Sequence, residues 1–377
     1  MYVDLPNLTD ALRATIKSGK TSPRYWAWSL GFLDFYALMA SSVTAAQRLD
    51  DALYPEWRRT QVKEPVFIFA GARSGTTLLH RLLALDEERF TSFKLYQTVV
   101  PAVSAYKAVD ALGALDQKFL GGRVSKKILA FDQSLFPGFR DIHPMGLTEA
   151  EEEEALFIYT LVSPAMLMLF PFIDEIPRAW SMDHLPESAK DKVMDFYRGC
   201  IQRHLTAEGV DRTMLVKSVL AAPRAEAMLD TFPDGRVIHL VRHPYQSIAS
   251  AISLLTLSWR SLFPDWKPDA PEFRRFGYLM MDFYRRYSEL GDHLGEDRFI
   301  TVPFDELTKD PQGQVEAIYE RFGWNMPQHV HDRLVRECSV KKQFKSTHKY
   351  SLEDFGLTKD EVYEELGDLF EKYGFER

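Results

Sequence analysis

A short loop at residues 71–77 carries groups that can bind an anion. It follows an apolar run at residues 65–70, typical of a buried strand, and precedes a leucine-rich helical segment. A strand, a tight loop and a helix bring backbone N–H groups and a helix N-terminus to one point, where negative charge is stabilised. Arg73 would add a cation, and Thr76 and Thr77 would add hydroxyl donors. The alternative is a plain strand–helix turn closed by a hydroxyl cap.

This loop differs from the Walker A motif of nucleoside triphosphatases. In that motif, G-x-x-x-x-G-K-[ST], the lysine reaches the β- and γ-phosphates. Here the glycines are one residue closer together, and Thr76 occupies the lysine position. A later strand-like run ends at Arg242 rather than at an acidic magnesium ligand. The sequence therefore disfavours a nucleoside triphosphatase, and we expect no bound metal.

Strand-like and helical patterns alternate along the chain, which predicts one α/β domain with a central parallel sheet flanked by helices. The expected strands are residues 65–70, 214–216, 236–241 and 299–302. The expected helices include residues 225–232, 244–257, 314–322 and 359–373, and one that begins at the capping-box residue Thr148. Leu8, Leu12 and Ile16 recur every four residues and predict additional N-terminal helices. We expect a helical extension at residues 1–62 and the main domain at residues 63–377.

The charge balance excludes some classes of partner and favours one compartment. Lysine and arginine total 46 against 54 acidic residues, a formal charge of −8, whereas nucleic-acid-binding domains are usually basic. Cys200 and Cys338 are the only cysteines, too few for a disulfide framework or a zinc site. We therefore expect no nucleic-acid partner and a reducing, cytoplasmic setting.

Two apolar segments bear on membrane association. Residues 25–40 include Asp34 and are shorter than the ~20 residues that a membrane span needs. Residues 156–173 are interrupted by Pro164 and Pro171, so we expect them to be buried or to line a pocket. We expect no transmembrane segment; a peripheral membrane contact through residues 25–40 is left open by the pattern.

Three segments, in order, resemble the sulfotransferases that use 3′-phosphoadenosine 5′-phosphosulfate (PAPS). They are PVFIFAGARSGTTLLHRLLALD, MLVKSVLAAPRAEAMLDTFPDGRVIHLVRHPYQSIASAISL and FDELTKDP. The arginine in the first loop resembles the bacterial branch of that family. The resemblance implies a P-loop-like sulfotransferase fold and transfer of a sulfuryl group from PAPS to a hydroxyl or amine of a small acceptor.

The resemblance also implies roles for individual residues. The 5′-phosphosulfate would be held by the first loop, that is by Arg73, Ser74, Gly75, Thr76 and Thr77. The 3′-phosphate would be held by Arg242 and Ser250, and Phe304 would lie near the adenine. A basic C-terminal loop would close on the 3′-phosphate through Lys345, Ser346 and His348. Lys217 would contact the sulfuryl group.

The base that removes the acceptor proton does not follow from the resemblance. Val219 stands where the animal enzymes have histidine, and Gln97 stands where many relatives have glutamate. His143, with an ordinary pKa near neutrality, is one replacement. Glu152 and Glu153 are another, because burial beside like charges would raise the pKa of a carboxyl there.

The sequence also suggests where the acceptor binds, and it leaves two alternative functions open. The apolar residues 156–173 and the region of Trp259 and Trp266 suggest a hydrophobic acceptor. One alternative function is a P-loop nucleotide phosphotransferase. The other is a catalytically inactive protein that binds PAP, the nucleotide product of PAPS, which the missing family bases at Val219 and Gln97 would favour.

Overall fold

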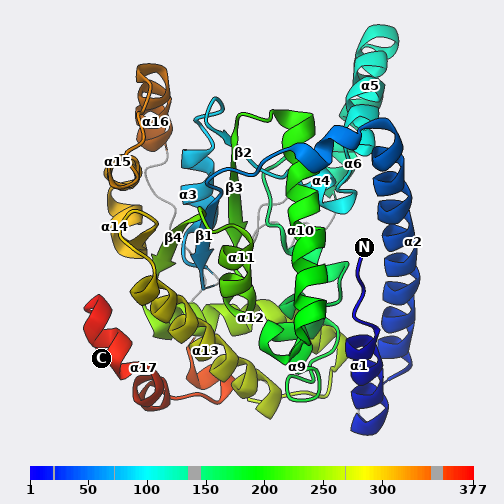
Figure 1. Cartoon of the computed structure of the whole chain (residues 1–377). Coiled ribbons are helices and arrows are strands. Elements are labelled where there is room, and N and C mark those ends of the chain that lie inside the picture. The colour runs from blue at the N-terminus through cyan, green and yellow to red at the C-terminus, as the bar shows by residue number, and fades with distance from the viewer. Residues whose placement is uncertain (20–21, 72, 135–145, 268, 341–350) are drawn as a thin grey trace.

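The computed structural model describes residues 1–19, 22–71, 73–134, 146–267, 269–340 and 351–377. These residues form an α/β fold around a parallel five-stranded sheet with strand order β2-β3-β1-β4-β5 (Figure 1). The strands are β1 (Val66–Ala70), β2 (Phe90–Thr91), β3 (Thr213–Ser218), β4 (Arg236–Val241) and β5 (Phe299–Pro303). The predicted central sheet is confirmed. The sequence pattern missed only β2, which has two residues and shows no periodicity.

The strand β1 lies at the centre of the sheet, and its register positions the loop that follows it. Ile68 is aligned with Lys217 on β3, and Ala70 is aligned with Leu240 on β4. The carboxyl ends of β3, β1 and β4 therefore meet at one edge. Ligands of parallel α/β sheets bind at this edge.

Helices cover both faces of the sheet, as the apolar strands require. Ile68 faces one layer and Phe69 faces the other. The first layer contains α3 (Thr76–Leu83), α14 (Phe304–Lys309), α15 (Pro311–Arg321) and α16 (Gln328–Val340). The second contains α10 (Glu187–Glu208), α11 (Ala225–Thr231), α12 (Pro244–Leu262), α13 (Pro271–His293) and α17 (Lys359–Tyr373).

The segment at residues 156–173 is buried, as predicted, and contributes Leu156, Leu167 and Phe170 to the core. It begins within α8 (Glu154–Ile158), and the short α9 (Pro177–Trp180) follows it. Thr148 does not start a helix, so that prediction is wrong. The backbone around Ala150 instead pairs with Lys94, and the Glu151 N–H donates to the Phe93 carbonyl oxygen.

Four N-terminal helices lie along one side of the molecule (Figure 1). They are α1 (Leu5–Ser18), α2 (Pro23–Leu53), α5 (Val103–Leu120) and α6 (Arg123–Ser134); the short α4 (Leu95–Val99) precedes α5. The predicted N-terminal helices are present. Leu8 and Leu12 on α1 pack against the core, whereas Ile16 is exposed. The helix that contains the apolar residues 25–40 continues to Leu53. The argument that it is too short to cross a membrane is therefore wrong, since α2 is long and apolar enough by length and composition.

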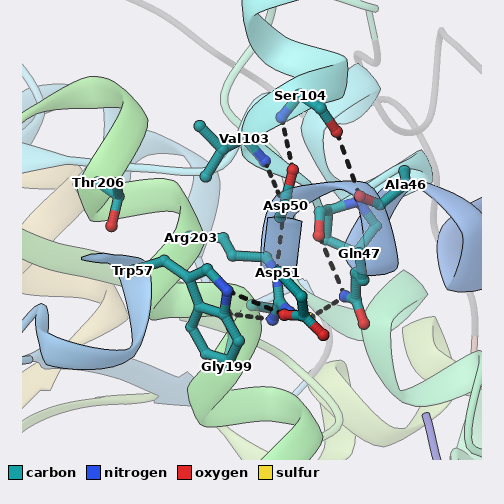
Figure 2. Close-up of polar contacts among 12 residues, drawn as sticks. Ala46, Gln47, Asp50, Asp51, Trp57, Val103, Ser104, Gly199, Arg203 and Thr206 are labelled. Atoms are coloured by element: carbon teal, nitrogen blue, oxygen red, sulfur yellow. Dashed lines mark hydrogen bonds and ion pairs between the residues drawn. The ribbon is translucent and has the colours of Figure 1, made fainter. Parts of the chain in front are cut away.

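A buried polar cluster fixes the start of α5 against α2 and α10 (Figure 2). Both Asp50 carboxylate oxygens accept 2.8 Å hydrogen bonds, from the backbone N–H groups of Val103 and Ser104. Arg203 Nε lies 3.2 Å from Asp50 Oδ2, and its guanidinium lies 3.6 Å above the Trp57 ring. Because Asp50 is wholly buried, removing Arg203 would leave its carboxylate without its ion-pair partner.

Candidate active site

The loop after β1 has an unusual backbone. Arg73 and Gly75 adopt positive φ values of 64° and 87°. A Cβ at Gly75 would lie 3.1 Å from the Phe304 ring, so only glycine fits there without strain. For Arg73 this backbone region costs about 1–3 kcal/mol, the kind of local strain that occurs at ligand sites. Gly75 caps the N-terminus of α3.

Ser74 provides an independent sign that this loop holds a ligand. Its side chain is wholly buried, and among the described residues its Oγ has no hydrogen-bond partner. Leaving a buried hydroxyl unpaired costs about 1–3 kcal/mol. An anion held above the N-terminus of α3 would accept this hydrogen bond together with those of the loop backbone.

Arg242 extends from the end of β4 to the same loop. Its Nη1 donates a 2.8 Å hydrogen bond to the Arg73 carbonyl oxygen, and its guanidinium lies 4.4 Å from the Phe304 ring centroid. Gln246 Oε1 accepts from Nε and Nη2 at 3.2 and 2.9 Å. Burial, and then the nearby Arg73 cation, lower the pKa of Arg242. Within the described part of the chain, the guanidinium of Arg242 contacts the Arg73 carbonyl oxygen, the Gln246 amide and the Phe304 ring, so these contacts leave its charge available to an anionic ligand.

Arg242 is held in place by residues that the sequence analysis did not single out. The Tyr284 hydroxyl donates a 2.8 Å hydrogen bond to the Arg242 carbonyl oxygen, and Ser247 is hydrogen-bonded to Tyr284. Gln246 precedes Ser250 by four residues on α12, so the two side chains share a helix face. Gln246 follows Arg242 by four residues, and this spacing is the only signal in the sequence that could have indicated the role of Gln246.

Lys217 lies near the carboxyl end of β3, the strand beside β1. Four consecutive glutamates at residues 151–154, the acidic run, include two that lie near it. Lys217 is only 1% exposed, and its Nζ lies 3.8 Å from Glu151 Oε2 and 3.6 Å from Glu152 Oε1. The Glu152 side chain is 19% exposed, although the lysine is buried. Burial, and then the Lys217 cation, lower the pKa of His80 on α3 to about 3, so this buried imidazole is neutral.

Comparison with known proteins shows which family has this arrangement of residues. A family model described as "Sulfotransferase family" matches residues 65–328, well over half of the chain. The chain belongs to the sulfotransferase family. It is therefore an enzyme that transfers a sulfuryl group, and the nucleotide phosphotransferase alternative is not supported. The match includes the loop, Lys217, Arg242 and Phe304, but not α1 or α2.

Individual relatives agree with this assignment. The proteins named omega-hydroxy-beta-dihydromenaquinone-9 sulfotransferase Stf3 from Mycobacterium bovis and Mycobacterium tuberculosis are each 24% identical over 326 residues, 83% of this chain and 76% of theirs. The structure of sulfotransferase STF9 from Mycobacterium avium has a TM-score of 0.71 at 19% identity, covering 91% of this chain and 85% of that one. STF1 from Mycobacterium tuberculosis has a TM-score of 0.69 at 19% identity, covering 96% and 91%. The sulfotransferase thus has the predicted P-loop-like fold of these proteins.

The structure brings only part of the predicted site together. The register and contacts above place Arg73, Lys217, Arg242 and Phe304 at one sheet edge. The predicted residues that lie outside the described part of the chain are His143, Lys345, Ser346 and His348.

Gln97, the counterpart of a family glutamate, has a structural role in this sulfotransferase. Its side-chain oxygen accepts a 2.8 Å hydrogen bond from the Lys94 N–H at the start of α4, and its amide donates to Glu208 at 2.6 Å. Trp259 also belongs to the core, because it is wholly buried and its Nε1 donates to the Leu167 carbonyl oxygen. Trp266 lines a hollow of about 500 Å³, so an apolar acceptor pocket at this place stays a prediction.

Glu153 confirms the expectation that one acid of the run is buried with a raised pKa. Burial raises its pKa to about 8, against the lowering effects of Arg224 and of the hydrogen bond that the Ser218 hydroxyl donates. Arg224 itself pairs with Glu154. Glu153 therefore holds a proton at neutral pH.

The titration of Glu153 should make the stability of the sulfotransferase pH-dependent. From about pH 4.5 to about pH 8 the unfolded carboxyl is ionised while the folded one stays protonated. The free energy of unfolding should therefore fall as the pH rises, by up to about 1.4 kcal/mol per pH unit. Glu153→Gln should flatten this dependence. Urea unfolding of both proteins at several pH values measures it, and parallel curves would contradict the assignment.

Proposed function

We propose that this sulfotransferase moves a sulfuryl group from PAPS to a hydroxyl of an apolar acceptor by in-line transfer. One observation carries the donor assignment: the loop after β1 and Arg242 after β4 converge on one point, joined by the 2.8 Å hydrogen bond from Arg242 to Arg73. The unpartnered hydroxyl of Ser74 supports an anion there. One arginine after each of two adjacent strands, Arg73 after β1 and Arg242 after β4, suits a ligand that carries two phosphate groups.

The donor-binding residues follow from this geometry. We assign Arg73, Ser74, Gly75, Thr76 and Thr77 to the 5′-phosphosulfate. We assign Arg242 and Ser250 to the 3′-phosphate and the Phe304 ring, beside Gly75 and beneath Arg242, to the adenine end. Lys345, Ser346 and His348 stay predicted contributors. Two free cysteines, Cys200 and Cys338, fit the proposed cytoplasmic setting.

Bound PAPS would supply the sulfuryl group and a phosphate leaving group. The protein contributes alignment and positive charge, which dominate catalysis of such transfers. Arg73 and Lys217 would stabilise the negative charge that develops on the oxygen bridging phosphate and sulfate. Lys217 is aligned with Ile68 on β1, next to the strand that ends in the loop.

We propose Glu152 as the base that accepts the acceptor proton. It is solvent-accessible and lies 3.6 Å from Lys217 Nζ, whereas Glu153 is 1% exposed, hydrogen-bonded to Ser218 and already protonated at neutral pH. A proton from the acceptor would thus pass to Glu152, with Lys217 beside it. His143 is the alternative that the sequence leaves open.

The acceptor is proposed to be an alcohol on an apolar, lipid-like molecule. The Stf3 relatives are named for an omega-hydroxylated dihydromenaquinone. Behind the acidic run, Leu156 and Phe157 begin the buried apolar segment, so the proposed base adjoins apolar residues in the chain.

Calorimetric titration with PAP tests the donor site. PAP should bind in the presence of a metal chelator, and Arg242→Ala should weaken binding by about 2–5 kcal/mol, since a buried phosphate loses its charged partner. The exposed Arg260 at the end of α12 gives a matched control, and Arg260→Ala should bind as wild type. Unchanged affinity in Arg242→Ala would remove this residue from the site. Absence of PAP binding to the wild type would refute the proposed donor.

A further inference from the structure

Exposed apolar side chains are concentrated on one side of this enzyme. With the exceptions of Val210 and Val335, the large apolar side chains exposed among the described residues all lie before residue 132, on or beside α1, α2, α5 and α6. These four helices form one side of the molecule (Figure 1). Single exposed apolar residues are ordinary, but a surface of this extent marks an interaction site.

The hairpin of α5 and α6 carries the densest part of this surface. Leu112, Leu115 and Phe119 lie three and four residues apart on α5, and Phe119 is 69% exposed. Val124, Ile128 and Phe131 lie four and three residues apart on α6 and are exposed as well. Each helix thus presents an apolar stripe to solvent within the described structure.

The tip of the hairpin is also positively charged, although the chain has a net charge of −8. Lys118, Arg123, Lys126 and Lys127 are all exposed. Asp116, the one acid between residues 116 and 127, is buried and closes the turn. Its carboxylate accepts hydrogen bonds from the Val124 N–H, the Ser125 N–H and the Ser125 hydroxyl at 3.1, 2.8 and 2.7 Å.

The base of the hairpin is joined to α2 by hydrogen bonds. Asp50 accepts hydrogen bonds from the first N–H groups of α5 (Figure 2). The amide of Gln47 donates a 3.1 Å hydrogen bond to the Pro101 carbonyl oxygen. The same residues hold the C-terminal half of α2 along the body of the enzyme. The end of α5 extends beyond the other helices (Figure 1).

We propose that the tip of the α5–α6 hairpin, with the exposed face of α2, docks the enzyme on an anionic lipid bilayer. Apolar side chains that enter the interface and a cluster of basic residues are the two signals that together give stable surface binding. A second copy of the chain fits this surface less well. A two-fold contact through the tip would oppose the same four cations, and lysine is depleted at protein interfaces. The role of the bilayer as the source of the acceptor rests on the proposed function; the docking itself does not.

Sedimentation of the full chain with lipid vesicles tests this proposal. Vesicles that contain phosphatidylglycerol should bind the wild type at least tenfold more tightly than vesicles of phosphatidylcholine alone, and added salt should reduce the difference. The double variant Phe119→Ser/Leu120→Ser should lose at least tenfold in binding to either vesicle. The double variant Lys126→Gln/Lys127→Gln should lose about fivefold per lysine on anionic vesicles only. Val210→Ser and Val335→Ser, which change exposed apolar residues elsewhere, should bind as wild type.

Other outcomes would overturn the proposal. One is wild-type binding by Phe119→Ser/Leu120→Ser; another is equal binding of the wild type to both kinds of vesicle. A third is that light scattering shows the wild type as a dimer and Phe119→Ser/Leu120→Ser as a monomer, while neither protein binds vesicles. PAP binding and transfer to a short water-soluble alcohol, measured without vesicles, should be unchanged in both tip variants. Failure of the wild type in those two assays would refute the proposed function and leave the vesicle result standing.

Discussion

Glu152→Gln is expected to lower kcat by about 100- to 10,000-fold, the usual contribution of general-base catalysis, with little change in the affinity for PAP. The variant keeps the size of the side chain but cannot accept the acceptor proton. Glu152 is the member of the acidic run that is both accessible and within 3.6 Å of Lys217 Nζ. Steady-state turnover at saturating PAPS with an apolar alcohol measures the effect.

Two comparisons make this experiment decisive. Glu149→Gln changes an exposed acid just before the run, one that pairs with Arg81 at 3.5 Å, and should keep turnover near wild type. The pH profile separates the two candidate bases, because a histidine base gives a limb near pH ~6.5 that His143→Ala abolishes. Near-normal turnover in Glu152→Gln together with loss of activity in His143→Ala would assign the base to His143.

Arg73→Ala is expected to lower kcat by about 100- to 1,000-fold, as removing one preorganised donor from a developing anion does in other enzymes. Affinity for PAP should fall by much less, because the charge on the bridging oxygen is larger in the transition state than in the bound donor. The Arg73 backbone also has a positive φ of 64°, so Arg73→Asn, which tolerates this region, controls for backbone strain.

The measurement pairs calorimetry of PAP with turnover at saturating PAPS. Arg81→Ala removes the same charge from the second turn of α3 and should alter neither quantity. If Arg73→Ala weakens PAP binding but leaves saturated turnover intact, Arg73 only binds the donor and takes no part in the chemical step.

The elements that position the site could be predicted from the sequence because their patterns are local. The apolar runs of β1 and β4, each followed by a helix, require a buried parallel sheet, and the chemistry lies where those strands end. The helix expected at Thr148 failed for a tertiary reason. Backbone pairing between Ala150 and Lys94, residues distant in sequence, replaces the hydrogen bonds that a helix would have made.

The sequence predicted which kinds of residue form the site, but only in part which residue has which role. The acidic run indicated a buried carboxyl, but which acid is buried depends on contacts with Ser218 and Arg224, more than 60 residues away. The loss of the family glutamate at Gln97 suggested an inactive protein, whereas the structure uses this amide to start α4. Hydrogen bonds between distant segments, such as that from Tyr284 to Arg242, leave no trace in local pattern.

The central position of β1 has a consequence for how the chain folds. Its partners are aligned through Leu215 and Arg236, which the ribosome adds about 150 residues or more after Val66. At about 5–20 residues per second, β1 waits on the order of ten seconds before either neighbouring strand exists. During synthesis its two phenylalanines and both of its edges have no native partner, so the nascent chain is open to aggregation at this point. The loop that follows β1 can therefore take its final shape only after most of the protein has been made.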